Sequence, residues 1–297
     1  MSLDQVTCEE VFRAAVTACQ PGRFVRSYLG DDPVRSRYVY GLALGNAAIS
    51  MLRGAGPVLH GVAITRDDDR TNLPKGWVAQ KPDETAAVAI VDLVASADTD
   101  DVILVLLSGG AEHILPHDLI DGGLARLAAA CPIRTLVASD RPGDQLAELA
   151  GAPTFPGRPQ DHIHAVTPYG MFAAGVQSEL IRRHVVVHLT SQPRGDLEAV
   201  AKMIVQEADD RGHAVLAFLG PELELTGPRA RLVAAAIGRL IAGTAHTAFV
   251  AASSGWDGPR GLDQPHPAGA FVDGTSFSLV YTQLTAIDYG GDIVMIG

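Results

Sequence analysis

The chain has 297 residues, of which 47% are hydrophobic and 19% are charged. This composition is typical of a folded globular protein and excludes a disordered chain or a fibrous repeat. The formal net charge of −11 at pH 7, from 23 basic and 34 acidic residues, disfavours nucleic acid and anionic membranes as partners.

The first predicted elements alternate between helix and strand. Residues 7–20 carry apolar side chains at helical spacing behind a threonine, which predicts a capped amphipathic helix that ends at Pro21. Residues 38–44 predict a strand that leads through a turn at Gly45 into a helix. Residues 58–64 predict the next strand, so the pattern favours an α/β protein.

The clearest strand signal is the apolar run at residues 102–107, which is typical of a parallel strand covered on both faces. Ser108-Gly109-Gly110 follows it directly. Residues 135–138 predict a second strand of this kind. In an open parallel sheet the loops after the strands line the ligand crevice, so we expect these loops and the Gly45 turn to meet at one site.

The second half of the chain continues the alternation. Residues 151–169 are rich in Pro and Gly and predict a long loop. The other predicted elements are strands at 184–189, 213–219 and 247–252, helices at 197–210 and 229–242, and a loop at 253–274.

The cysteines and the N-terminus indicate the cellular compartment. Cys8, Cys19 and Cys131 are widely spaced, which favours reduced thiols over a disulfide scaffold or a zinc site. The first residues lack the pattern of a signal peptide, and no apolar run approaches the roughly 18 residues of a membrane span. We therefore expect a cytoplasmic protein with no membrane partner.

A candidate anion site follows the clearest strand. The sequence lacks P-loop, dinucleotide-binding, zinc-protease and hydrolase-elbow motifs. The turn Ser108-Gly109-Gly110 instead places backbone N–H groups and a hydroxyl after a buried strand, where they could cradle an anion. A simple reversal of the chain is the alternative interpretation.

Several ionisable residues lie on or beside these loops. Glu112 and His113 could form an acid–base pair or ligate a metal, or could be ordinary solvated residues. Asp140 and Asp144 bracket a loop after a strand, and Asp257 lies in a later loop. Such carboxylates hold Mg²⁺ at phosphoryl-transfer sites, although they are also common in plain turns.

Two histidine pairs are weaker candidates for a metal site. His113 and His117 have the spacing of one helical turn, but Pro116 between them disfavours a helix. His162 and His164 would share one face of a strand, but their surroundings predict a loop.

Taken in order, eight segments resemble the glycerate 2-kinase family that carries a MOFRL-type C-terminal domain. They span nearly the whole chain: EEVFRAAVTACQPGRFV, GNAAISMLRGA, KPDETAA, VLLSGG, GGLA, LVASDRPGDQLAELAGAPTFPG, GDLEAVAKMIVQEA and SSGWDGPRGLDQPHPAGAFVDGTS.

The resemblance implies an α/β fold with two domains. A Rossmann-like parallel-sheet domain is expected at residues 1–210, and a smaller, shortened α/β domain at 211–297, with the active site in the cleft between them. The family phosphorylates D-glycerate, so the resemblance also implies ATP and Mg²⁺ as cofactors, a small-molecule substrate and a homodimer.

Together, the loops and the resemblance indicate three groups of site residues. The expected catalytic residues are Glu112, His113 and Asp257. The residues expected to bind substrate or an anion are Asn46, Ser108, Gly109, Gly110, Arg141, Glu222, Arg229 and Arg231. The expected metal ligands are Asp140 and Asp144.

The chain departs from the family pattern where the chemistry is expected. Asn46 stands in place of the family's lysine, and Ala79-Gln80 in place of a His-Pro pair. The family's Ser-Gly-Gly-Gly-Ser reads here as Ser108 to Glu112, and its Asn-x-Val-Arg-Lys segment before Gly122 is deleted.

These departures remove positive charge from the expected site. Cations that stabilise a transferring phosphoryl group contribute several kcal/mol, so we expect glycerate phosphorylation to be lost or altered. The sequence therefore predicts a divergent enzyme that acts on a small hydroxy acid or a related metabolite. The alternatives are a lyase or isomerase on the same scaffold, or a binding protein without catalysis.

Overall fold

The structure is a computed structural model of the chain, in which contacts define two compact units. One unit comprises residues 1–19, 170–284 and 290–297, and the other comprises 20–169 and 285–289. The residues described are 4–65, 72–111, 114–128, 131–138, 152–155, 157–167, 170–190, 194–211, 215–219, 222–223, 229–252, 269–280 and 292–297.

The unit of residues 20–169 is built on a parallel sheet of six strands. Their order across the sheet is β3-β2-β1-β4-β5-β6. The strands are β1 (Val39–Leu44), β2 (His60–Ile64), β3 (Trp77–Gln80), β4 (Val102–Ser108), β5 (Ile133–Ala138) and β6 (His162–Thr167). The helices are α2 (Pro21–Asp31), α3 (Ala48–Ala55), α4 (Glu84–Ala95), the 3-10 turn η2 (His117–Leu119) and α5 (Gly123–Leu127).

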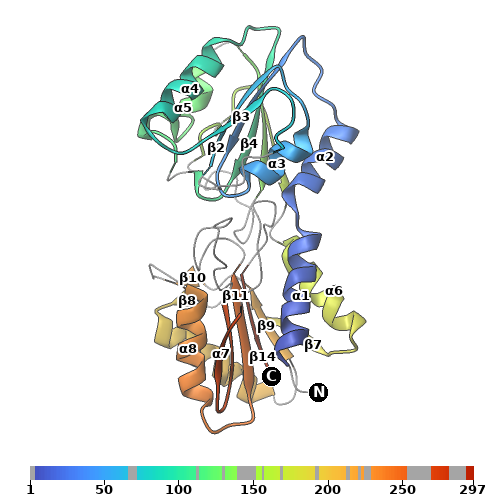
Figure 1. The fold of residues 1–297 in the computed structure, drawn as a ribbon, viewed down its shortest axis with the longest axis vertical. Helices are drawn as coiled ribbons and strands as arrows, with labels where there is room; N and C mark the ends of the chain where they lie inside the picture. The colour runs from blue at the N-terminus through green and yellow to red at the C-terminus, as the bar shows by residue number, and fades with distance from the viewer. Residues whose placement is uncertain are drawn as a thin grey trace. The chain divides into compact units, whose positions relative to one another are not determined.

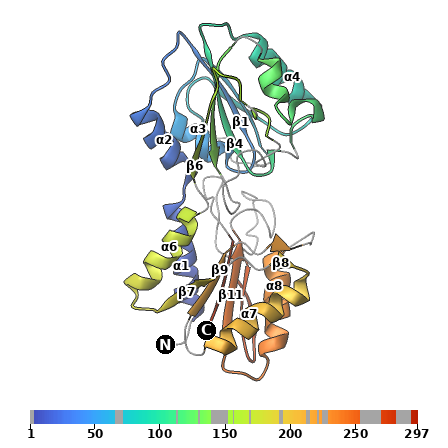
Figure 2. The ribbon, with the colours of Figure 1, turned by 180° about the vertical axis from the view of Figure 1, so that it is seen from behind.

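Helices cover both faces of this sheet (Figures 1 and 2). Leu42 and Leu44 point to the face with α4 and α5, where they join a buried cluster with Ile90. Ala43, between them in the strand, points to the other face and packs with Leu52 of α3. Because both faces are buried, the strands read as continuous apolar runs in the sequence.

A tryptophan explains two glycines in the central strands. Gly41, Gly61 and Trp77 are register partners on β1, β2 and β3. A Cβ atom at Gly41 would lie 2.4 Å from Cη2 of the buried Trp77 indole. The indole Nε1 donates a hydrogen bond to the carbonyl of Gly56 at 2.9 Å. The glycines therefore provide the space in which the ring lies across the sheet.

The other unit contains a sheet in the order β13-β12-β11-β14-β9-β7. The β7–β9 pair is parallel and the other pairs are antiparallel. The strands are β7 (Val187–Thr190), β9 (Val215–Leu219), β11 (Thr247–Ala252), β12 (Gly269–Asp273), β13 (Phe277–Val280) and β14 (Asp292–Ile296). A separate short pair is formed by β8 (Arg194–Gly195) and β10 (Glu222–Leu223).

Two pairs of helices pack on this second sheet. They are α1 (Gln5–Ala18), α6 (Gly170–Arg182), α7 (Leu197–Arg211) and α8 (Arg229–Ile241). Residues of α7 and α8 share a buried cluster with Val250 and Val294. The Phe12 ring of α1 contacts the rings of Phe172 and Phe249. Packing therefore places α1, from the start of the chain, with elements from its second half.

The predicted fold class, a Rossmann-like parallel sheet together with a second α/β domain, is confirmed. The contacts divide the chain differently from the expected boundary after residue 210. Strand β7 and helix α7 precede that residue, yet they pack with β9 and β14 of the second sheet.

Three local expectations are corrected. Helix α1 is capped by Asp4, whose carboxylate accepts the amide of Thr7, and not by a threonine. The helix does end before Pro21, as expected, and Pro21 is the first residue of α2, where a missing N–H is tolerated. Strand β6 lies within the predicted loop 151–169, and β12 within the predicted loop 253–274. Both strands contain or adjoin polar and glycine residues, which mask the strand pattern.

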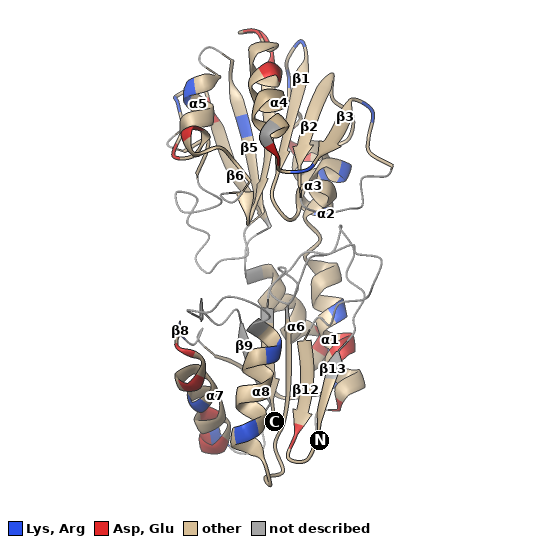
Figure 3. Cartoon of the chain, turned by 60° about the vertical axis from the view of Figure 1, so that its left-hand side comes forward, with Lys and Arg blue, Asp and Glu red and all other residues tan. Residues whose placement is uncertain are grey.

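The strands are mostly uncharged, and charged residues fall mainly on helices and connections (Figure 3). Among the described residues, no helix has the length and apolar character needed to cross a membrane. Cys8, Cys19 and Cys131 are free thiols in the interior. Burial raises the pKa of Cys19 to about 12 and that of Cys131 to about 11, so both remain protonated near neutral pH.

Candidate functional site

The candidate site lies where the order of the parallel sheet reverses. From β1 the chain proceeds to β2 and β3 on one side, and then returns to β4 on the other side of β1. Ligands of open α/β sheets bind at such a point, beyond the carboxyl ends of the strands. Here the two loops concerned are Gly45–Ala47 after β1 and Ser108–Gly110 after β4.

The hydroxyl of Ser108 joins these loops. It donates a hydrogen bond to the carbonyl of Leu44 at 3.0 Å and accepts one from the amide of Ala47 at 2.9 Å. Ser108 is fully buried. Its hydroxyl is thus engaged in holding the site together, whereas the sequence assigned it to ligand binding.

Glycine at position 45 is required by this close approach. Gly45 has a φ of +99°, and a Cβ atom there would lie 2.3 Å from the carbonyl oxygen of Ser108. The amide of Asn46 donates to the carbonyl of Gly109 at 3.0 Å. The backbones of the two loops are therefore interlocked, and a side chain at position 45 would separate them.

Asn46 lies over the second glycine of the turn after β4. Gly110 has a φ of +86°, and its notional Cβ would be 3.1 Å from both Oδ1 and Nδ2 of Asn46. Among the residues that the structure describes, the amides of Gly109 and Gly110 have no hydrogen-bond acceptor. The site thus presents backbone donors and a neutral carboxamide, which suit a small anion.

Gln80 also lies at the carboxyl ends of these strands. The sequence analysis noted it as a departure from the family pattern but did not include it among the site residues. It ends β3, and its carbonyl accepts the amide of Thr65 at 3.1 Å. Its side-chain Oε1 is buried without a hydrogen-bond partner. The available signal was that a polar residue stands where the two neighbouring strands end in Leu44 and Ile64.

The other predicted site residues fall into two groups. Glu222 on β10 and Arg229 and Arg231 on α8 belong to the unit of the second sheet. Those outside the described residues are Glu112, His113, Asp140, Arg141, Asp144 and Asp257. The described members that meet at one place are Asn46, Ser108, Gly109 and Gly110.

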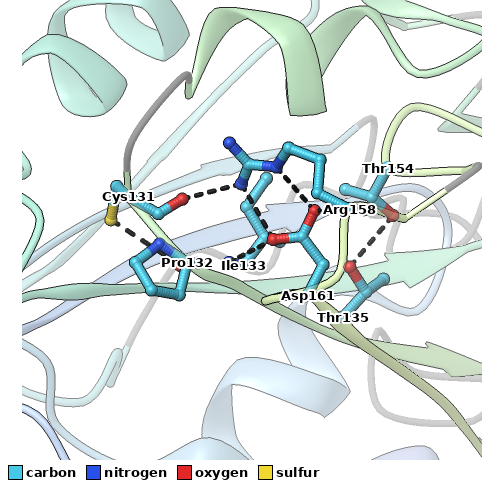
Figure 4. A network of polar contacts seen from close by, with 7 residues as sticks. All are labelled: Cys131, Pro132, Ile133, Thr135, Thr154, Arg158 and Asp161. Atoms are coloured by element: carbon cyan, nitrogen blue, oxygen red, sulfur yellow. Dashed lines mark hydrogen bonds and ion pairs between the residues drawn. The ribbon is translucent and has the colours of Figure 1, made fainter.

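The segment around Asp161 has a structural role at the amino ends of the strands, away from the glycine turn (Figure 4). The buried Asp161 carboxylate accepts hydrogen bonds from the Arg158 guanidinium at 2.7 and 2.8 Å and from the amide of Ile133 at 2.9 Å. Arg158 also donates to the carbonyl of Cys131 at 2.7 Å. These contacts hold the amino ends of β5 and β6.

The histidine pairs do not form a metal centre in the described structure. His164 stacks on the ring of Tyr28 at a centroid distance of 4.3 Å. His117 lies in the short 3-10 turn η2, and His113 is outside the described residues. Within the described ranges, no group of three or more His, Cys, Asp or Glu side chains could hold a metal ion.

The described part of the site fits ATP and Mg²⁺ poorly. Triphosphate sites combine backbone amides with Lys or Arg and a carboxylate-bound metal. The loops 45–48 and 108–111 contain neither Lys nor Arg, and Asn46 is neutral. We therefore derive no phosphoryl-transfer step from this geometry.

Comparison with known proteins agrees with the predicted resemblance. A family model described as "Domain of unknown function (DUF4147)" matches residues 7–121. Glycerate kinases of Mus musculus and Homo sapiens are each 25% identical to this chain over 261 residues, which is 63% of the chain and 49% of each relative. The chain thus spans about half the length of these curated relatives.

Two solved structures share the fold. A glycerate kinase from Thermotoga maritima matches with a TM-score of 0.75 and 17% identity, over 98% of both chains. The PH0495 protein from Pyrococcus horikoshii OT3 matches with a TM-score of 0.69 and 18% identity, over 100% of this chain and 99% of that one. The resemblance to the glycerate kinase family that the eight sequence segments predict is therefore confirmed.

Proposed function

We propose that this chain is a divergent glycerate kinase-like enzyme that acts on a small hydroxy acid or a related anionic metabolite. In this proposal the ligand's acidic group binds at the turn after β4, and phosphoryl transfer to glycerate is weak or absent. ATP and Mg²⁺ remain the cofactors implied by the family.

The observation that carries the proposal is the neutral turn at the sheet's reversal point. The amides of Gly109 and Gly110, which have no acceptor among the described residues, can bind a carboxylate without a cation. Asn46 lies against the same turn, in place of the family's lysine. A transferring phosphoryl group carries more charge and depends on cations, so the substitution favours binding over phosphoryl transfer.

The roles of the other site residues are part of the proposal. Glu112 or His113 would supply proton transfer beside the turn. Asp140 and Asp144 would bind Mg²⁺ or orient the substrate. The positive charge missing at position 46 would be replaced in part by Arg141.

Calorimetry with D-glycerate and with Mg-ATP tests this function, followed by an assay for phosphorylated product. We expect saturable binding of the acid and little product. Asn46→Lys should raise product formation about tenfold, because it restores a cation beside the turn. Ser27→Lys adds the same charge to an exposed position in the same unit and should change nothing. No binding of either ligand would refute the proposal.

A reaction other than phosphoryl transfer is the second candidate. It is favoured by the same absence of Lys and Arg from the two described loops. A lyase or isomerase step needs a bound carboxylate and a proton-transfer group, but no nucleotide. Binding of the acid that is unaffected by Mg-ATP, with consumption of the acid measured by NMR, would identify this alternative. Binding without consumption would indicate a binding protein.

A further inference from the structure

The carboxamide of Asn46 is an unused donor and acceptor beside the glycine turn. Asn46 lies in the loop after β1, and its backbone amide donates to the carbonyl of Gly109 at 3.0 Å. Among the described residues, by contrast, no group forms a hydrogen bond with the side-chain atoms Oδ1 and Nδ2 of Asn46. The backbone of this residue is therefore engaged in the fold, while its side chain is not.

The carboxamide turns its flat face toward the turn. A Cβ atom at Gly110 would lie 3.1 Å from Oδ1, 3.1 Å from Nδ2 and 3.2 Å from Cγ of Asn46. Because the two polar atoms are equally distant from Gly110, neither of them is aimed at the turn itself. The N–H and C=O groups extend to either side and stay available to a molecule that binds the turn.

A ligand can reach this carboxamide. Asn46, Gly109 and Gly110 are each half-buried, whereas Ser108, next to them, is fully buried. Oδ1 and Nδ2 of Asn46 are also not among the enclosed, unpaired polar atoms of the described residues. The bond from the Asn46 amide to Gly109 fixes the backbone, so the side chain starts from a defined position before a ligand arrives.

A donor next to an acceptor is complementary to a 2-hydroxy acid. Nδ2 of an asparagine can donate to a carboxylate, and Oδ1 can accept the hydrogen of a hydroxyl group on the adjacent carbon. A 2-oxo acid has only acceptors at these two positions and would leave Oδ1 facing another oxygen. The lysine that the family has at this position carries donors and no acceptor, so it cannot make this distinction.

We infer that Asn46 accepts a hydrogen bond from the 2-hydroxyl group of the substrate and so selects 2-hydroxy acids over 2-oxo acids. The carboxylate of the acid binds the amides of Gly109 and Gly110, beside the Asn46 carboxamide. This inference rests on the proposed function and specifies its substrate class. It makes Asn46 a specificity-determining residue, whose acceptor a lysine would not supply.

The test compares D-glycerate with hydroxypyruvate by calorimetry, because the two acids have the same length and charge and differ only at carbon 2. The wild type should bind D-glycerate about tenfold more tightly. Asn46→Ala should reduce that ratio to about twofold or less, since neither acid then meets the acceptor. Gln206→Ala is the control and should keep the wild-type ratio, because the Gln206 amide donates to Asp210 on an exposed helix face.

Asn46→Lys provides a second variant in which binding is gained. It should bind both acids more tightly than the wild type, because it adds a cation, yet it should also lower the ratio to about twofold or less. The melting temperature of ligand-free Asn46→Ala should stay within about 2 °C of the wild type, because the side chain has no hydrogen bond to lose.

Two results would overturn the inference. One is equal binding of both acids by the wild type, and the other is a wild-type ratio that persists in Asn46→Ala and in Asn46→Lys. Either result would leave the proposed function intact, because the acids would still bind. Binding of neither acid to the wild type would refute the proposed function and this inference together.

Discussion

Ser108 and Ala47 are 61 positions apart, and a hydrogen bond of 2.9 Å from the Ala47 amide to the Ser108 hydroxyl joins them in the interior. The same hydroxyl donates to Leu44. One side chain thus fixes the end of β4 against the end of β1, and the position of the glycine turn depends on it.

Ser108→Ala should destabilise the unit of the parallel sheet. The change leaves the Ala47 amide and the Leu44 carbonyl without this partner, at a cost of about 2 kcal/mol in the free energy of unfolding. Urea denaturation followed by circular dichroism measures the loss. Ser96→Ala is the control, because the Ser96 hydroxyl is exposed and bonds only its own helix. Equal effects at both positions would contradict the bridging role.

Gly41→Ala should be strongly destabilising because its Cβ would overlap the Trp77 indole. We expect a loss of about 3 kcal/mol in the free energy of unfolding. Gly30→Ala, in α2, has nothing within 4 Å of the added Cβ and should instead stabilise by about 0.5–1 kcal/mol. In a Trp77→Leu background the cost of Gly41→Ala should fall. An unchanged cost would show that the indole is not the cause.

Two non-glycine residues with positive φ should tolerate glycine well. Ala152 has a φ of +42°, and His184 has a φ of +59° just after α6. The amide after His184, that of Val185, bonds the carbonyl of Leu180, as in a helix that ends with a left-handed residue. Each change to glycine should stabilise by about 0.5–1 kcal/mol in thermal denaturation.

The opposite change provides the check on this argument. Gly243 has a φ of +77° and open space around its notional Cβ, so only backbone strain opposes a side chain there. Gly243→Ala should destabilise by about 1 kcal/mol. Neutral results at Ala152, His184 and Gly243 together would argue against these backbone conformations.

Asp161→Asn should destabilise the parallel-sheet unit by about 3 kcal/mol, because it leaves the Arg158 guanidinium without its buried partner. Glu198→Gln, in an exposed pair with Arg239, should cost less than about 1 kcal/mol. Chemical denaturation at neutral pH compares the two. Similar losses would mean that burial does not strengthen the Asp161 pair.

The same pair predicts an acid-dependent loss of stability. Burial alone would raise the pKa of Asp161, but the hydrogen bonds from Arg158 and Ile133 outweigh it and lower the pKa below its ordinary 3.8. A lowered folded-state pKa means that the stabilisation is complete above pH 3.8 and is lost as the pH falls through the folded value. In Asp161→Asn, stability should depend less on pH in this range.

The sequence predicts those elements whose burial leaves a local pattern. Strand β4 is enclosed on both faces and appears as an unbroken apolar run followed by two glycines. Strand β6 escapes because it lies at the sheet edge, where His162 and His164 are exposed and interrupt the pattern. The alternation of His162 and His164 with apolar residues is a strand signal, but the Pro and Gly residues around it favoured a loop.

The meeting of the two loops was predictable, but the contacts between them were not. The glycine turn after a buried strand was predicted as an anion site, which stays a prediction, and Asn46 was selected by comparison with the family pattern. The engagement of the Ser108 hydroxyl and the unpaired oxygen of Gln80 depend on how strands far apart in the sequence align. Register of that kind is a tertiary property, which no local pattern encodes.

Two ion pairs described in the parallel-sheet unit lie at the amino ends of its strands. Arg37 with Asp101 precedes β1 and β4, and Arg158 with Asp161 precedes β6. A substitution at the carboxyl ends, such as asparagine where the family has lysine at position 46, leaves both of these pairs untouched. The residues that anchor the amino ends are thus separate from those that face a ligand.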